Sequence, residues 1–130
     1  MGTKVALGEL QTPSTAITAE PVFKADGFAV TLRFEFDRNG VIYRSGVRFE
    51  HPRAYRSRAE IHCTAWHIEG AYDTIAEVQR SDWVAELTEA TPAESRTLWE
   101  MHHFMIYIDS AGCFEVAASG WSLLPEERVR

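Results

Sequence analysis

Cysteine is rare in this sequence, and long apolar runs are missing. The 130 residues contain two cysteines, Cys63 and Cys113, which are too few for a disulfide scaffold. Both lie in strand-like segments, which favours free buried thiols, with a disulfide across adjacent strands as the alternative. No apolar run has the pattern of a signal peptide, and none approaches the length of a bilayer span. We therefore expect a soluble cytoplasmic protein without a membrane partner.

Motifs that identify an enzyme class or a bound cofactor are also missing. The sequence has no Gly-x-Ser-x-Gly elbow, no glycine-rich phosphate loop and no dinucleotide fingerprint. It has no His-x-x-x-His pair, so a metal site would have to combine His62 and His102 from separate strands with a carboxylate or Cys63. Half-exposed histidines in a sheet are the simpler interpretation. We expect no cofactor and no metal site, and we assign no catalytic residue.

What the sequence does contain is the composition of one globular domain. Apolar residues make up 45% of the chain and aromatic residues 12%, as in proteins that bury a core. A chain of this length forms such a core without crosslinks. We predict a single domain over residues 1–130, with residues 1–18 weakly ordered and residues 125–130 forming a polar tail. The formal net charge of −6 argues against a general attraction to nucleic acid.

The clearest local pattern is a β-hairpin over residues 102–118. Its arms alternate in polarity, and a loop with Asp, Ser and Gly separates them. The pattern predicts a three-residue loop, Ser110–Gly112, with Asp109 paired with Cys113 and Gly112 in the left-handed conformation. One face then carries the core residues Phe104, Ile106, Ile108, Phe114, Val116 and Ala118. The other face carries His103, Met105, Tyr107, Asp109, Cys113, Glu115 and Ala117.

A second hairpin is predicted over residues 28–36 and 41–49. Its first arm places Phe28, Val30, Leu32, Phe34 and Phe36 on one face. A four-residue loop, 37–40, pairs Phe36 with Val41 and Phe28 with Phe49, which keeps apolar side chains opposite one another. A slip of one residue would reverse every side chain, so we favour this loop over a three-residue one.

The remaining elements are shorter. Strands are predicted at 21–24, 59–68, 74–78 and 121–124. Ser81 or Asp82 caps a helix over about 82–90, and a capping box at Thr91–Glu94 begins a second short helix that ends near Trp99. No alternation of strands and helices indicates a parallel sheet. The fold class is therefore α+β, a mostly antiparallel sheet with one or two short helices late in the chain. A β-sandwich with a helical insertion is the alternative.

Charge is distributed unevenly along the chain. Residues 38–58 contain six Arg and one Glu, whereas residues 60–100 contain nine acids and two Arg. Pro52 ends a strand, so we interpret the segment after it as a loop. This candidate interaction loop, with Arg53, Tyr55, Arg56 and Arg58, suits an acidic protein surface, a phosphate or, less well, RNA. The alternative is a solvated loop that pairs with acids of the same chain or of a neighbouring subunit.

The polar face of the first hairpin is a candidate pocket. His103, Tyr107 and Glu115 share this face, and the predicted register places Tyr107 opposite Glu115. An imidazole and a carboxylate on a rigid sheet are the ingredients of general acid–base catalysis, but they also form ordinary cross-strand pairs. If helices cover this face and leave a hollow, it becomes the best binding site in the chain.

A motif in the second half of the chain resembles a known group of proteins. Residues 81–87 read Ser-x-Trp-x-x-Glu-Leu, and a His-aromatic strand and a Glu-Val-x-Ala strand follow at 103–118. This pattern, over roughly residues 60–120, resembles small uncharacterised bacterial proteins to which no chemistry is assigned. The resemblance implies a bacterial protein and carries over no functional residue. Some toxin-immunity proteins have a similar size and acidity, which is an analogy.

Two functional hypotheses follow from these observations. The first is a non-enzymatic protein-interaction module, either binding a partner protein or associating with itself as a homodimer. It rests on the missing catalytic motifs and on the uneven charge. The alternative is a small-molecule-binding protein or small enzyme that uses the face with His103, Tyr107 and Glu115.

Overall fold

The computed structural model describes residues 2–98 and 100–129, and most of them form strands. Five strands make up sheet A: β1 (Thr3–Glu9), β5 (Ala54–Arg58), β6 (Thr74–Gln79), β7 (His102–Ile108) and β8 (Gly112–Ala118). Five others make up sheet B: β2 (Val22–Asp26), β3 (Ala29–Arg38), β4 (Val41–Glu50), β9 (Gly120–Leu123) and β10 (Glu127–Arg128). The helices are α1 (Ala65–Ile68) and α2 (Asp82–Ala90), with 3-10 turns η1 (Ser14–Ala16), η2 (Glu60–His62) and η3 (Ala93–Ser95).

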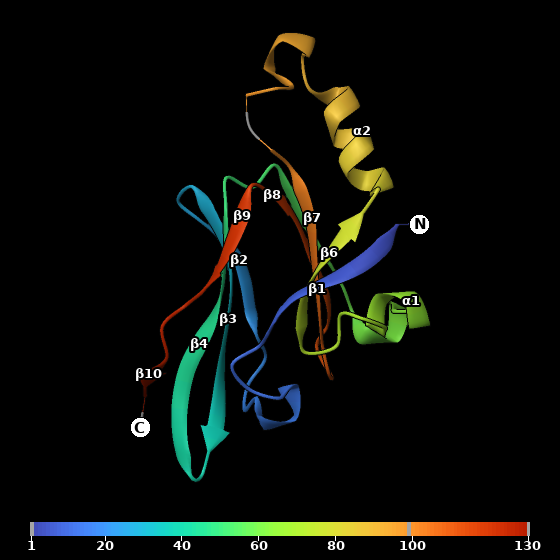
Figure 1. Ribbon diagram of the computed structural model, residues 1–130. Coiled ribbons are helices and arrows are strands. Elements are labelled where there is room, and N and C mark those ends of the chain that lie inside the picture. Colours follow the sequence, from blue (N-terminus) through green and yellow to red (C-terminus); the bar gives the residue numbers. More distant parts are fainter. Residues whose placement is uncertain (1, 99, 130) are drawn as a thin grey trace.

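Both sheets are antiparallel. Sheet A has the order β1-β6-β7-β8-β5, and sheet B has the order β10-β4-β3-β2 with β9 also paired to β4. Every strand pairing among the described residues is antiparallel. The two sheets lie face to face, and α2 extends beyond their upper end (Figure 1). The prediction of a mostly antiparallel α+β protein with short helices therefore holds in this broad form.

The main core lies between the two sheets. Sheet B contributes Val30, Leu32, Phe34, Phe36, Val47 and Phe49, and sheet A contributes Ile75, Phe104, Ile106, Ile108, Phe114, Val116 and Ala118. Both predicted apolar faces are in this set, because alternation along a strand fixes which side chains point inward. Phe28 is an exception. It lies in the turn before β3 and is 87% exposed, so its predicted place in the core was wrong.

The hairpin of β7 and β8 has the predicted faces but a different register. Tyr107 pairs with Cys113 and Met105 with Glu115, so the predicted pairs Asp109–Cys113 and Tyr107–Glu115 were wrong. The loop is Asp109–Ala111, in which Ser110 adopts a φ of 66°. A shift of two residues preserves the alternation of faces, so the apolar pattern cannot distinguish the two registers.

The hairpin of β3 and β4 differs in the same way. Arg38 pairs with Val41 and Phe36 with Tyr43, so the loop is the dipeptide Asn39-Gly40 rather than four residues. Asn39 and Gly40 have φ values of 56° and 83°, the left-handed pair that a two-residue hairpin turn requires. The turn chemistry of Asn-Gly determines this loop, and the longer loop was wrong.

Residues 51–68 were assigned to the wrong elements. The predicted loop contains strand β5, which pairs with β8 at the edge of sheet A. The predicted strand at 59–68 is instead η2 and α1. Thr64 and His67 form a capping box at the start of α1, in which the Thr64 N–H donates to His67 Nδ1 at 2.9 Å. Because α1 lies in the middle of the chain, the helices are not confined to its late part, where one or two short helices were predicted.

The second half of the chain follows the other predictions more closely. Strand β6 and helix α2 occur where they were expected, and Ser81 is the N-cap of α2. The expected second helix is reduced to the three residues of η3, and its predicted end at Trp99 lies outside the described residues. Residues 3–9 of the N-terminal segment form β1, and part of the C-terminal tail forms β10. In the described part of the chain, no helix combines the length and apolarity needed to cross a membrane.

Candidate functional site

The outer face of sheet A, which points away from sheet B, is covered by two segments. Below, Cys63, Trp66 and Ile68 of the η2–α1 segment pack on Met105, Tyr107 and Cys113. Above, the start of α2 packs on β7. The face with His103 and Glu115 is thus buried, and helical segments lie over it, as the pocket hypothesis requires.

A buried hydrogen-bonded pair lies on this face. His103 Nε2 is 2.7 Å from Glu115 Oε1, and each side chain is only 3% exposed. Arg56 of β5 approaches the same carboxylate with both Nε and Nη2, each at 3.1 Å from an oxygen. A buried carboxylate needs such partners, because desolvation of an unpaired charge costs several kcal/mol. Burial raises the pKa of Glu115, but hydrogen bonds from His103 and Arg56 outweigh it and lower the pKa to about 2.

Ser81 connects this pair to helix α2. Its Oγ lies 2.7 Å from His103 Nδ1 and accepts the N–H of Val84 at 3.1 Å, as an N-cap residue does. In the tautomer whose Nε2–H donates to the ionised Glu115, Nδ1 accepts the Ser81 hydroxyl proton. The hydrogen bonds then run in one direction, from Ser81 through His103 to Glu115.

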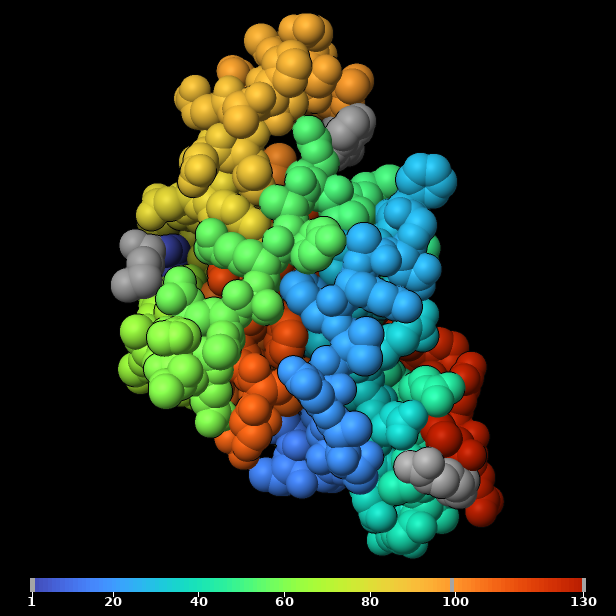
Figure 2. All heavy atoms as spheres, turned by 180° about the vertical axis from the view of Figure 1, so that it is seen from behind, coloured from blue at the N-terminus to red at the C-terminus, as the bar shows by residue number. Residues whose placement is uncertain are grey.

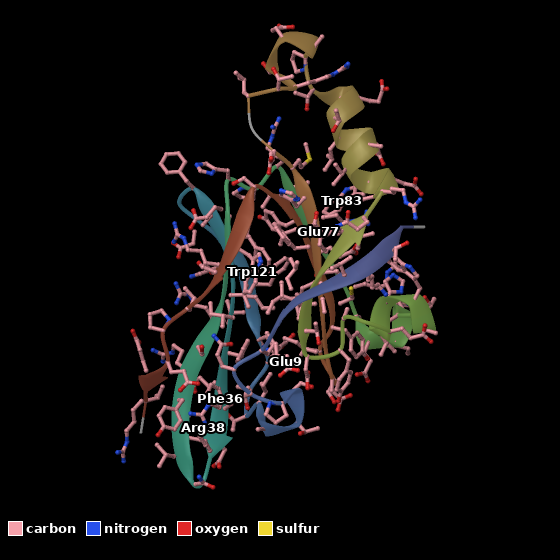
Figure 3. The ribbon with its side chains drawn as sticks, viewed as in Figure 1. Glu9, Phe36, Arg38, Glu77, Trp83 and Trp121 are labelled. Carbon is pink, nitrogen blue, oxygen red and sulfur yellow. The ribbon has the colours of Figure 1, made fainter. Side chains whose placement is uncertain are left out.

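Trp83 contacts both His103 and Arg56. Its ring contacts His103 edge-on, with centroids 5.0 Å apart and an interplanar angle of 72°. The Arg56 guanidinium lies over the same ring, 4.0 Å from the centroid, in a cation–π arrangement. Trp83 lies at the start of α2, near the end of sheet A where Glu77 of β6 is also found (Figure 3). The first turn of α2 therefore positions Ser81 and Trp83 together.

A cleft of about 320 Å³ opens beside this network. Its walls include Arg56, Arg58, Trp66, His67, Ser81 and Trp83, and His103 contributes to its lining. On the face seen in Figure 2, the yellow residues of α2 lie above the yellow-green α1 segment, with the green residues around β5 beside both. Among the described residues, the Arg58 guanidinium has no hydrogen-bond or ion-pair partner. The cleft thus holds one uncommitted cation and two tryptophans.

The candidate pocket of the sequence is only partly assembled. His103 and Glu115 are in contact, but Tyr107 belongs to a different cluster. Its hydroxyl donates to Glu60 Oε2 at 3.0 Å, and its ring stacks on Tyr72 with centroids 6.0 Å apart. Burial, together with the hydrogen bond to Glu60, raises the pKa of Tyr107 to about 12. Tyr107 therefore stabilises the η2 segment rather than completing the site.

The candidate interaction loop is divided between two faces of β5. Arg56 and Arg58 pair across from Glu115 and Cys113, on the outer face of sheet A. Tyr55 points the other way, where its ring meets Phe23 of β2 edge-on at 5.6 Å. Arg53 precedes the strand, and its Nη2 is 3.4 Å from Thr91 Oγ1. The four residues therefore do not form one common surface.

Sequence reasoning did not assign Ser81 or Trp83 to the site. Both lie in the helix start that the capping signal predicted, so the helix was found but not its contact with His103. The contact depends on where α2 lies on sheet A, which no local pattern specifies. Arg56 was singled out as a basic residue, yet its pairing with Glu115 required β5 to be a strand.

The thiols and histidines provide no metal site in the described part of the chain. Cys63 and Cys113 are free, and burial raises the pKa of Cys113 to about 12. His102 contacts two carboxylates, Glu77 at 2.7 Å and Glu100 at 3.0 Å. Nevertheless, residues 2–98 and 100–129 contain no group of three or more potential ligands able to hold a metal ion.

Comparison with known proteins adds no further information about the site. Neither a protein-family model, nor a curated protein, nor a solved structure matches this chain. The resemblance to small bacterial proteins therefore stays a prediction, and function has to be argued from the geometry.

Proposed function

We propose that this protein binds a small organic anion in the cleft between α1 and α2. The observation that carries the proposal is the uncommitted Arg58 guanidinium beside the half-exposed Arg56 in a cleft walled by Trp66 and Trp83. The proposal follows the second sequence hypothesis, with Arg58, Trp66 and Trp83 in place of Tyr107.

The chemistry of the cleft defines the class of ligand. Guanidinium groups recognise carboxylates and phosphates through paired hydrogen bonds, and tryptophan rings contact flat apolar groups. Glu115 is screened from an anion, because Arg56 pairs with its charge and His103 forms a further hydrogen bond with it. Asp82 at the rim is the remaining acid of the cleft. A volume of about 320 Å³ suits a small molecule rather than a peptide or a nucleic acid. We therefore expect an aromatic or cyclic carboxylate or phosphate.

Calorimetric titration tests the proposal. The probes are benzoate, indole-3-acetate, phenyl phosphate and inorganic phosphate, with tryptophan fluorescence as a second readout. Arg58→Gln should weaken the best ligand about ten-fold or more, because it removes charge-assisted hydrogen bonds. Arg44→Gln is the matched control, since Arg44 is exposed on sheet B and pairs with Glu35 at 3.1 Å. Absence of binding by all four probes, or equal weakening in both variants, would refute the proposal.

Self-association, the first sequence hypothesis, is a second candidate, with a second copy of this chain as the partner. The ion pairs of Arg38, Arg44, Arg48 and Arg56 use Glu126, Glu35, Glu50 and Glu115, all outside the acidic residues 60–100. The exposed acids Glu86 and Glu89 of α2 therefore remain available to a neighbouring molecule. On β5, the basic residues Arg56 and Arg58 are exposed. Reciprocal contact of α2 with β5 would form a closed two-fold dimer.

Light scattering behind a sizing column, at low and at high salt, tests this second candidate. A dimer that weakens as salt screens the charges would support it. The double variant Glu86→Lys with Glu89→Lys should then abolish the dimer without changing stability, because neither side chain packs in the core. A monomer at both salt concentrations would exclude self-association.

A further inference from the structure

We propose that Ser81 is a nucleophile, with His103 as its general base and Glu115 as the group that orients this base, and that the cleft hydrolyses small carboxylic esters. The nucleophile inference rests on the hydrogen-bonded array alone. The expected substrate class, esters that carry a second anionic group, rests on the proposed function, because Arg58 would hold that group.

The geometry of the array is that of an activated hydroxyl. Ser81 Oγ lies 2.7 Å from His103 Nδ1, and His103 Nε2 lies 2.7 Å from Glu115 Oε1. Both distances are within the range at which a base removes a hydroxyl proton and a carboxylate fixes the tautomer of that base. Trp83 holds the imidazole from the side. The ring therefore has a defined orientation before any substrate binds.

Accessibility matches the role of each residue. His103 and Glu115 are 3% exposed, so water does not compete for their hydrogen bond. Ser81 is half-buried and lines both the cleft of about 320 Å³ and a neighbouring one of about 260 Å³. A substrate can therefore reach the hydroxyl while the base stays shielded. The Val84 N–H donates to Ser81 Oγ, whereas the N–H groups of Asp82 and Trp83 lack acceptors within the helix and are the kind of donor that stabilises an oxyanion.

The reaction balances with water as the co-reactant. Ser81 Oγ attacks the ester carbonyl carbon while its proton passes to His103 Nδ1. The bond to the alcohol oxygen breaks, and that oxygen takes the proton from Nδ1, which leaves the acyl group on Oγ. Water then attacks the acyl carbon and gives a proton to Nδ1. The bond to Oγ breaks, the proton returns to Ser81, and the acid leaves. Glu115 stays ionised and stabilises the imidazolium in both steps.

A purely structural role for Ser81 makes a different prediction. As an N-cap, Ser81 is replaceable by Asn, which also accepts the N–H of the first helical turn. Ser81→Asn should therefore keep the fold of α2 while removing the nucleophile. Ser57→Ala is the matched control, because Ser57 is an exposed serine on β5 at the edge of the same sheet.

The test is labelling of the intact protein with a neutral fluorophosphonate, followed by peptide mass spectrometry. We expect one adduct, on Ser81, that is retained in Ser57→Ala and absent from Ser81→Asn. His103→Gln should slow labelling by at least about ten-fold if the imidazole is the base, with circular dichroism confirming that the variant is folded. A folded wild-type protein without a Ser81 adduct would overturn the inference.

Chromogenic esters separate this inference from the proposed function. Hydrolysis of p-nitrophenyl acetate is compared with that of mono-p-nitrophenyl glutarate, which carries an anion. A preference for the glutarate that Arg58→Gln removes supports both proposals. Labelling of Ser81 without this preference supports the nucleophile and refutes anion recognition. Calorimetric binding of an anion without any Ser81 adduct refutes the nucleophile and leaves the binding function intact.

Discussion

The two faces of sheet A are buried to a similar degree but by different means. The inner face, with Phe104, Ile106 and Val116, belongs to the apolar core between the sheets. The outer face has charged residues, and His103 and Glu115 are as buried there as Phe104 is on the other side. Burial of apolar side chains needs only shape and volume, whereas burial of charged groups requires a partner for each atom. The stability of the outer face therefore depends on individual hydrogen bonds, whereas that of the inner face does not.

The largest expected effect on the free energy of unfolding comes from a substitution of Glu115 on the outer face. Glu115→Leu leaves Arg56 without its carboxylate and His103 Nε2 without an acceptor, although leucine fits the volume. Removal of one partner of a buried pair typically costs about 3 to 5 kcal/mol. On the inner face, the conservative change Ile106→Val should cost about 0.5 to 1.5 kcal/mol. Urea unfolding followed by tryptophan fluorescence measures both. Equal losses in the two variants would show that the outer face tolerates change as well as the inner face does.

The faces, but not the partners, were predictable from the sequence. Alternation assigned residues 103 to 118 to the correct sides, since the period of two is a property of every strand. It did not fix the registers of the two hairpins, because a shift of two residues keeps each side chain on its face. In β3–β4 the dipeptide Asn39-Gly40 specifies the register, because it favours a two-residue turn. In β7–β8 the loop residue with positive φ is Ser110, and a serine does not indicate such a turn as clearly as Asn-Gly does.

The site itself was less predictable, and the reason is geometric. His103 and Glu115 lie on neighbouring strands of one hairpin, so their contact follows from local pairing. Ser81 lies 22 residues before His103, and Arg56 lies 59 residues before Glu115. Those contacts exist because α2 and β5 dock on the sheet. Helix α1 has four residues. That is about one turn, too short for a helical pattern to repeat in the sequence, and so its segment was mistaken for a strand.

A fall in pH should weaken the contacts of the outer face and leave those of the inner face unchanged. The folded-state pKa of Glu115 is lowered to about 2 from an ordinary value of 4.5. A lowered pKa contributes stability that is complete above the unfolded value and is lost as pH falls toward 2. The free energy of unfolding of the wild-type protein should therefore decline between about pH 4.5 and pH 2. Glu115→Leu should lack most of this decline, whereas Ile106→Val should show it with a constant offset. Parallel curves for all three proteins would contradict the assignment of this acid sensitivity to Glu115.

The smallest expected effect lies at the start of β7, at His102, whose ring contacts Phe104 of the inner face. Burial lowers the pKa of His102, but the hydrogen bonds that its ring donates to Glu77 and Glu100 outweigh this effect and raise the pKa above 6.5. A raised pKa gives stability that is complete below the unfolded value and is lost as pH rises through the folded value. The wild-type protein should therefore lose a little stability as pH rises above 6.5, and His102→Gln should not. Because His102 is 30% exposed, solvent screens its ion pairs and keeps the effect well below that of Glu115. Thermal unfolding across this pH range measures it. A pH-dependent loss in His102→Gln as large as in the wild-type protein would assign the titration to another group.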